Sequence, residues 1–216
     1  MTVTRAEVVA PRGRYPGRVA AKSTYAQASK TLLRNSLLDA LRDLLQQRDW
    51  SSVTMADVAT ITGVSRQTVY NEFGSRMGLA TAYAMRLVGE FCDVVAAAVR
   101  DNVDDLDAAL RQGFADFFRW AAADPMIRSL LDGEAKPDLL RLITTDAAPL
   151  IDSATDQLTG LLTSSWVQLS TTDAVRIGGA IARMALSYVA MPPQNDRDVA
   201  ADVAAVIAPA VLAARR

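Results

Sequence analysis

The chain has 216 residues, of which half are hydrophobic, and a formal net charge of −1, enough for one or two small domains with cores of their own. It contains one cysteine and no histidine. An internal disulfide is therefore excluded, and the commonest metal ligand and general base is absent. We expect no catalytic residue, no metal, no cofactor and no enzymatic activity.

The charge is divided unevenly along the chain. Residues 1–80 hold eleven Lys and Arg against six Asp and Glu, a net charge of +5, whereas the remainder holds twelve against eighteen, a net charge of −6. A basic N-terminal part favours contact with phosphates, although ordinary variation in composition gives the same asymmetry.

Residues 1–28 are predicted to form a flexible basic arm. Pro11, Gly13, Pro16 and Gly17 interrupt any helix there, and the arm either contacts DNA or has no role. No apolar signal segment precedes it and no apolar run reaches the roughly 20 residues that span a bilayer, so we expect a cytoplasmic protein with no membrane contact. The basic residues of the arm are Arg5, Arg12, Arg14, Arg18 and Lys22.

Leucines recur at helical spacing from Ser29 to Arg48, which predicts a supporting helix, and Trp50 is expected to fold back onto the unit. Two short helices should follow. Thr54 and Ser65 stand at their N-caps, and Gly63 supplies the positive φ that ends the first. The predicted inner residues are Met55, Val58, Ala59, Ile61, Val64, Val69 and Phe73.

Polar side chains are left for the outer side of the second short helix. Such a face beside a turn containing glycine is typical of a helix-turn-helix unit, whose second helix enters the major groove. The alternative is a helical pair within some all-α core. The outward residues are Arg66, Gln67, Thr68, Tyr70, Asn71 and Glu72.

From Thr54 to Leu79 the sequence resembles the TetR family of bacterial transcriptional repressors. The chain departs from the family pattern at Asp49, where Gly is usual, and at Thr62, Gln67 and Arg76, where Ala, Gly and Lys are usual. These departures bear on operator choice more than on the fold. The resemblance covers about the first third of the chain and rests on Val53, Thr54, Val58, Ala59, Gly63, Val64, Ser65, Val69, Tyr70, Phe73, Ser75, Arg76 and Leu79.

The resemblance implies a double-stranded DNA operator as partner, and these residues are the candidate DNA contacts. Tyr70, Thr54 and Arg76 are assigned to phosphates, and Arg66 to either phosphates or bases. Ser65 caps the reading helix and is included in the contact set. Gln67, Thr68 and Asn71 are assigned to base edges, since amide side chains suit adenine.

The C-terminal part, residues 81–216, is predicted to be helical throughout. The expected helices run over residues 75–100, 105–123, 149–169, 171–191 and 196–214, with short pieces beginning at Pro125 and Pro137. The fold class is therefore all-α, with a helix-turn-helix domain over residues 29–80 and an effector-binding and dimerisation domain over residues 81–216.

An aromatic and methionine cluster in this domain is either ordinary core or the lining of the effector cavity that the resemblance implies. In the second reading the effector is hydrophobic, with long-chain fatty acids or acyl-CoA first and cationic drugs second. The candidate ligand-binding residues are Phe91, Phe114, Phe118, Trp166, Met184 and Tyr188.

The last two helices carry small and apolar residues over Gly178–Met191 and Val203–Ala214. The resemblance implies a homodimer built from them, and the alternative is packing within one chain. The predicted function is a ligand-responsive repressor. A helical enzyme or carrier for a lipophilic compound, and a DNA-binding dimer without effector, remain as alternatives.

Overall fold

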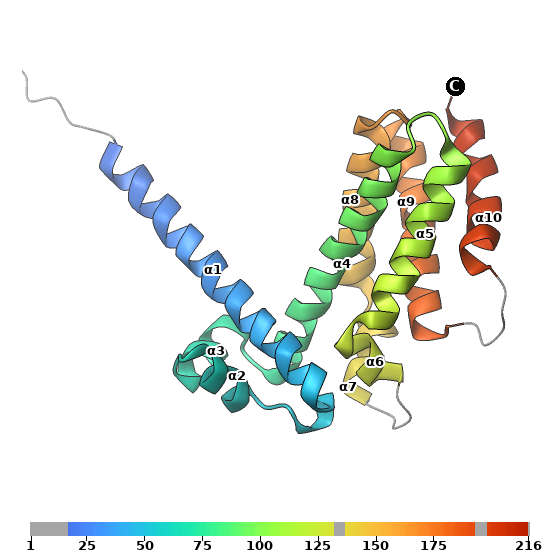
Figure 1. The fold of residues 1–216 in the computed structure, drawn as a ribbon. Coiled ribbons are helices and arrows are strands. Elements are labelled where there is room, and N and C mark those ends of the chain that lie inside the picture. Colours follow the sequence, from blue (N-terminus) through green and yellow to red (C-terminus); the bar gives the residue numbers. More distant parts are fainter. Residues whose placement is uncertain (1–16, 132–136, 193–197, 216) are drawn as a thin grey trace, which may run out of the picture. The chain divides into compact units, whose positions relative to one another are not determined.

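The computed structural model describes residues 17–131, 137–192 and 198–215, and in these ranges the secondary structure is helical with no strand (Figure 1). The chain divides into two units, residues 1–36 and 37–216. Within the described ranges, none of the helices combines the length and the apolar character that crossing a bilayer requires.

Helix α1 spans Gly17–Gln47. It starts well before the predicted Ser29, so the prediction of a non-helical arm is wrong for residues 17–28. The helix breakers Pro11, Gly13 and Pro16 precede this start, and the following Ala, Lys and Gln residues favour helix. Arg5, Arg12 and Arg14 of the predicted arm lie outside the described residues.

The helix-turn-helix unit follows the second half of α1. The short 3₁₀ turn η1 spans Trp50–Ser52, α2 spans Met55–Thr62 and α3 spans Arg66–Phe73. Trp50, Val58 and Val69 are buried, as predicted. Val64 is only half-buried. Ile61 was predicted to face inward but is 50% exposed, because α2 is only two turns long and buries its opposite side.

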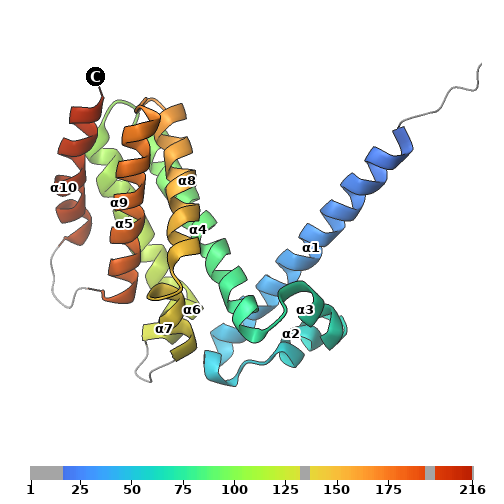
Figure 2. The ribbon, with the colours of Figure 1, turned by 180° about the vertical axis from the view of Figure 1, so that it is seen from behind.

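Five longer helices lie side by side in the rest of this unit (Figures 1 and 2). They are α4 (Arg76–Asp101), α5 (Leu106–Ala123), α8 (Ala148–Ser164), α9 (Thr171–Ala190) and α10 (Val199–Ala214). Two short helices, α6 (Pro125–Leu131) and α7 (Pro137–Ile143), lie at one end of the longer ones. Burial raises the pKa of Cys92 on α4 to about 11, so its thiol stays protonated, as expected of a small buried hydrophobe.

Helix α8 ends at Ser164, earlier than the predicted Leu169. The chain then turns through Gln168, whose φ is +54°, and the Leu169 N–H donates to the Leu162 carbonyl over 3.0 Å. The indole of Trp166 donates to the Val99 carbonyl on α4 over 2.6 Å. Tertiary contacts thus end α8 where the apolar pattern alone would continue it.

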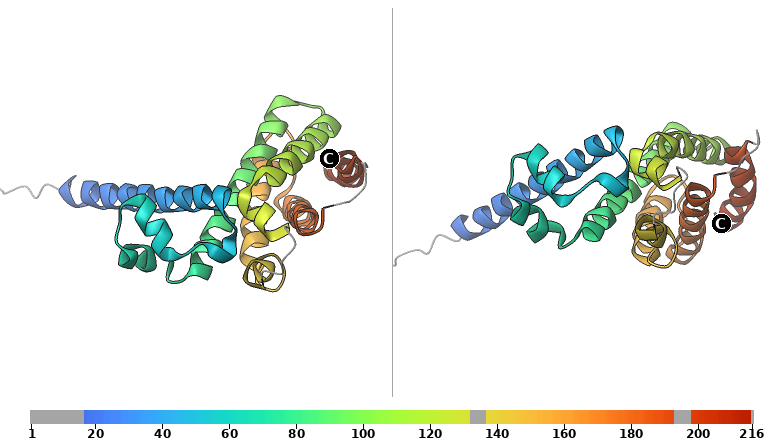
Figure 3. Two further views of the ribbon diagram at one scale, coloured as in Figure 1. Left: turned by 60° about the horizontal axis from the view of Figure 1, so that its bottom comes forward. Right: turned by 90° about the horizontal axis from the view of Figure 1, so that it is seen from below.

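Helix α10 packs against α5 and α9 within the same chain (Figure 3). Val203, Ile207 and Val211 are buried in this way, whereas Val206 and Leu212 on the other side are 66% and 57% exposed. The apolar residues of α10 therefore serve two faces, of which only the outer one is available to a partner.

Candidate nucleic-acid interface and apolar cavity

The two short helices of the reading head are closed by side-chain caps. The Thr54 hydroxyl accepts from the Asp57 N–H over 3.2 Å, and the Asp57 carboxylate accepts from the Thr54 N–H over 2.8 Å, forming a capping box. These hydrogen bonds from Thr54 lower the pKa of Asp57. Gly63 ends α2 with a φ of +70°, and the Ser65 hydroxyl accepts from the Thr68 N–H at the start of α3.

The outer side of α3 carries paired polar side chains. The Gln67 amide donates to Asn71 Oδ1 over 2.8 Å, and the Arg66 guanidinium lies 5.3 Å from the centre of the Tyr70 ring and donates to its hydroxyl. Arg66, Gln67 and Asn71 are exposed, and Thr68 and Tyr70 are half-buried. The hydrogen-bonding groups of the first three are thus presented on the helix surface, as the prediction of base and phosphate contacts requires.

Arg76 is oriented differently from the expectation of a phosphate contact. Its guanidinium lies 4.1 Å from the centre of the Trp50 ring and donates a hydrogen bond to the Trp50 carbonyl. Trp50 is only 2% exposed, which confirms that it folds back onto the unit. Arg76 therefore holds Trp50 in place.

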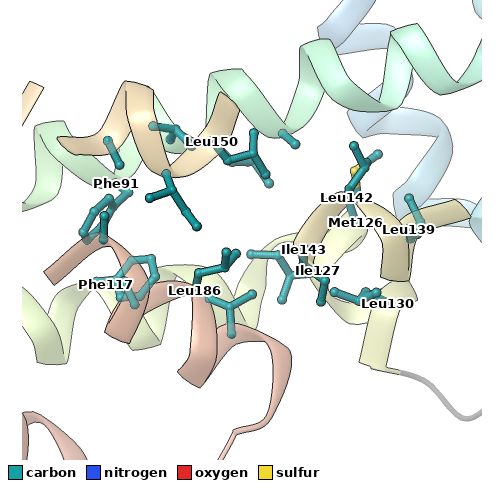
Figure 4. Close-up of a pocket in the computed structure, with 18 of the residues that line it drawn as sticks. Phe91, Phe117, Met126, Ile127, Leu130, Leu139, Leu142, Ile143, Leu150 and Leu186 are labelled. Carbon is teal, nitrogen blue, oxygen red and sulfur yellow. The ribbon is translucent and has the colours of Figure 1, made fainter. Parts of the chain in front are cut away.

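An apolar cavity of about 110 Å³ lies among α4, α5, α6, α7, α8 and α9 (Figure 4). Phe91, Phe117 and Leu186 face it from one end, and Met126 and Leu142 from the other. All of its lining side chains are aliphatic or aromatic apart from the Met126 thioether, and none is charged. Such a space accepts a hydrocarbon group and offers no partner to a buried charge.

The structure divides the six predicted ligand-binding residues. Phe91 lines the apolar cavity, whereas Phe118 and Tyr188 pack edge to face and line a second hollow among α5, α6, α9 and α10. Phe114 is buried in the core, Met184 packs against it, and Trp166 stacks with Arg215.

Most residues that line the cavity are aliphatic, and the sequence analysis missed them. Aromatic clustering pointed to Phe91 but also to core residues, because both environments favour the same side chains. Short α6 and α7 carry apolar side chains into the space, and this signal was present in the sequence. The missed residues include Leu87, Leu130, Leu139, Leu150, Ile151 and Leu186.

A capped helix pair with a polar outer face, joined to a helical domain with an apolar cavity, defines a helix-turn-helix DNA-binding regulator with a small-molecule domain. Residues 37–83 match the family of bacterial regulatory proteins described as the tetR family, and residues 105–209 match the C-terminal domain of the bacterial tetracycline repressor. The chain belongs to the TetR family of transcriptional regulators, which bind DNA operators and act as dimers.

Relatives support this assignment over most of the chain. The HTH-type transcriptional regulator AlkX of Mycobacterium tuberculosis is 52% identical over 206 residues, covering 95% of this chain and 94% of the relative. The crystal structure of the TetR family repressor AlkX from Dietzia sp. strain DQ12-45-1b, implicated in biodegradation of n-alkanes, is 40% identical with a TM-score of 0.79. It covers 85% of this chain and 97% of its own. RolR without ligand, at 19% identity with a TM-score of 0.55 and 84% and 96% coverage, shares the fold.

Proposed function

We propose that the protein is a dimeric repressor that is released from its operator by an apolar, chain-like small molecule bound in the α4–α9 cavity. The observation that carries this proposal is the lining of the cavity, in which no side chain is charged. The free energy of binding would come from burying hydrocarbon surface, at about 25 cal/mol per Å².

The ligand class follows from the same lining. Long-chain fatty acids and acyl-CoA have an alkyl chain that fits it, and n-alkanes are candidates because a relative that is 40% identical is implicated in their biodegradation. Cationic drugs are poorer candidates, since the net negative charge of the C-terminal part is not matched by any carboxylate in the lining. We assign the alkyl chain to the cavity of Phe91, Phe117 and Leu186.

Operator binding is assigned to α3 and its caps. Gln67 and Asn71 would read base edges, and Arg66 and Tyr70 would contact phosphates or bases, because their polar groups lie at the helix surface. A twofold dimer would present two such helices to half-sites about 34–36 Å apart.

The test begins with an operator selected from random DNA fragments by the purified protein. Fluorescence anisotropy then gives operator affinity with and without palmitate or n-hexadecane, and calorimetry gives ligand affinity. Leu186→Trp should fill the cavity and abolish the response while DNA binding by the empty protein persists. Val175→Trp, on the exposed side of the same helix, is the matched control. If the ligands bind but operator affinity stays constant, the protein is not such a repressor.

A further inference from the structure

Helix α6 has an apolar side and a polar side. Met126, Ile127 and Leu130 line the apolar cavity. Asp124, which precedes the helix, and Ser129, within it, are buried polar side chains that are 4% and 6% exposed. Buried polar groups are retained where they are hydrogen-bonded, so the partners of these two residues show what α6 is attached to.

Ser129 is bonded to the reading head. Its hydroxyl accepts from the Trp50 N–H over 3.1 Å and donates to Asp49 Oδ2 over 2.9 Å. Trp50 in turn lies under the guanidinium of Arg76, the first residue of α4. A continuous set of contacts thus runs from the cavity wall through Ser129 and Trp50 to the residue that follows the cap of α3.

Asp124 makes a second connection. Its Oδ1 accepts from the Met126 and Ile127 N–H groups over 2.9 and 3.1 Å, and its Oδ2 accepts from the Tyr83 hydroxyl over 2.8 Å. Arg42 of α1 lies 3.5 Å from the same oxygen. Burial and the charge of Asp124 raise the pKa of Tyr83, which keeps its hydroxyl protonated as a donor.

Asp49 stands where members of the family usually have glycine. Its φ of −64° and ψ of 150° are open to any residue, so the backbone does not explain the side chain found there. The carboxylate accepts from the Ser51 N–H over 2.8 Å and from Ser129 across a sequence separation of 80 residues. The departure from the family pattern therefore supplies a bond between the reading head and α6.

We infer that the Ser129–Asp49 and Asp124–Tyr83 hydrogen bonds couple the occupancy of the cavity to operator affinity, with α6 as the element that moves. A ligand that displaces Met126, Ile127 or Leu130 shifts α6 and strains both bonds at once. A bonded α6 favours one placement of the reading head, and a ligand that shifts α6 disfavours it. This inference rests on the proposed function and specifies its regulation.

The test uses the full-length protein, its selected operator and palmitate as the probe. The variants are Ser129→Ala, Asp49→Asn and their double mutant, with Ser129→Thr to restore the hydroxyl. Ser164→Ala and Asp107→Asn are matched controls, because both side chains are exposed and neither lines the cavity. For each variant, calorimetry gives the dissociation constant of palmitate, and anisotropy gives that of the operator with and without palmitate.

The quantity compared is the factor by which saturating palmitate weakens operator binding. We expect about 5- to 150-fold for the wild type. Ser129→Ala and Asp49→Asn should each reduce this factor by about 3- to 10-fold, the effect of one hydrogen bond, while palmitate binds at least as tightly as before. Ser129→Thr should restore the factor, the controls should keep it, and the double mutant should lose no more than either single mutant.

A purely structural role would lower thermal stability and leave this factor unchanged. A wild-type factor in folded Asp49→Asn, which keeps the size of the side chain, overturns the inference even if Ser129→Ala does not fold. If the wild-type protein itself binds palmitate without any change in operator affinity, the proposed function fails and the inference falls with it.

Discussion

A side chain at position 78 has no room. A Cβ placed on Gly78 would lie 2.0 Å from the Phe73 carbonyl oxygen, where α3 ends and α4 begins. Because that oxygen belongs to the backbone, the junction itself must shift to admit a methyl group. We expect Gly78→Ala to lower the free energy of unfolding by about 1–3 kcal/mol, measured by chemical denaturation, and to weaken operator binding.

Gly89 provides the control on the same helix. No atom lies within 4 Å of a Cβ at this position, so Gly89→Ala should raise the free energy of unfolding by about 0.5–1 kcal/mol through better helix propensity. Equal effects of the two substitutions would mean that the close approach of Gly78 to Phe73 has no energetic consequence.

Two arginines near α3 differ in what they hold. Arg66 is exposed on the reading helix, whereas the Arg76 guanidinium is stacked on Trp50. Arg66→Ala should reduce the slope of log affinity against log salt by about 1, the effect of one lost phosphate contact. Arg76→Ala should leave that slope unchanged and lower the thermal midpoint of unfolding. A flatter slope for Arg76→Ala would restore the sequence-based assignment of Arg76 to phosphate.

Sequence specificity is assigned to the amide pair on α3. Gln67→Ala should cost about 1–3 kcal/mol in operator binding and relax the choice of base at one position, because it removes a base contact and frees Asn71. Repeating the selection from random fragments measures this. Glu72→Ala, on the same helix but outside the proposed contact set, serves as the control. An unchanged preference for Gln67→Ala would move base reading to other residues.

Single helices were predictable where local chemistry sets their ends. Thr54, Gly63 and Ser65 each determine a cap or a positive φ, so α2 and α3 begin and end as predicted. The C-terminal end of α8 was not predictable, because it depends on a positive φ at Gln168 and on the bond from Trp166 to α4. The cavity was predictable as apolar, but its lining was not, since core and lining use the same side chains.

The outer faces of α9 and α10 are where the predicted dimer is tested. Ala180 and Val206 are exposed, whereas the neighbouring Gly178, Val203 and Ile207 are buried within the chain. Ala180→Arg and Val206→Arg should each shift the sedimentation equilibrium toward monomer without unfolding the chain, because the new charge would be buried only in a dimer. An unchanged dimer for both variants in ultracentrifugation would place the interface on other helices.

In the molecule as a whole, the cavity and α3 belong to one unit of the chain, residues 37–216, and α4 begins beside the reading helix and lines the cavity further along. Two sites so connected must affect each other equally. If palmitate weakens operator binding by a given factor, operator DNA must weaken palmitate binding by the same factor.

This reciprocity gives a prediction that depends on neither site assignment. The dissociation constant of palmitate, measured by calorimetry, should rise by about 5- to 150-fold when the protein is saturated with its selected operator. A duplex of unrelated sequence, at a salt concentration where it does not bind, should leave that constant unchanged. If operator DNA leaves palmitate affinity unchanged although palmitate releases the operator, palmitate acts on the DNA complex other than through the cavity, for example by dispersing the dimer as a detergent would.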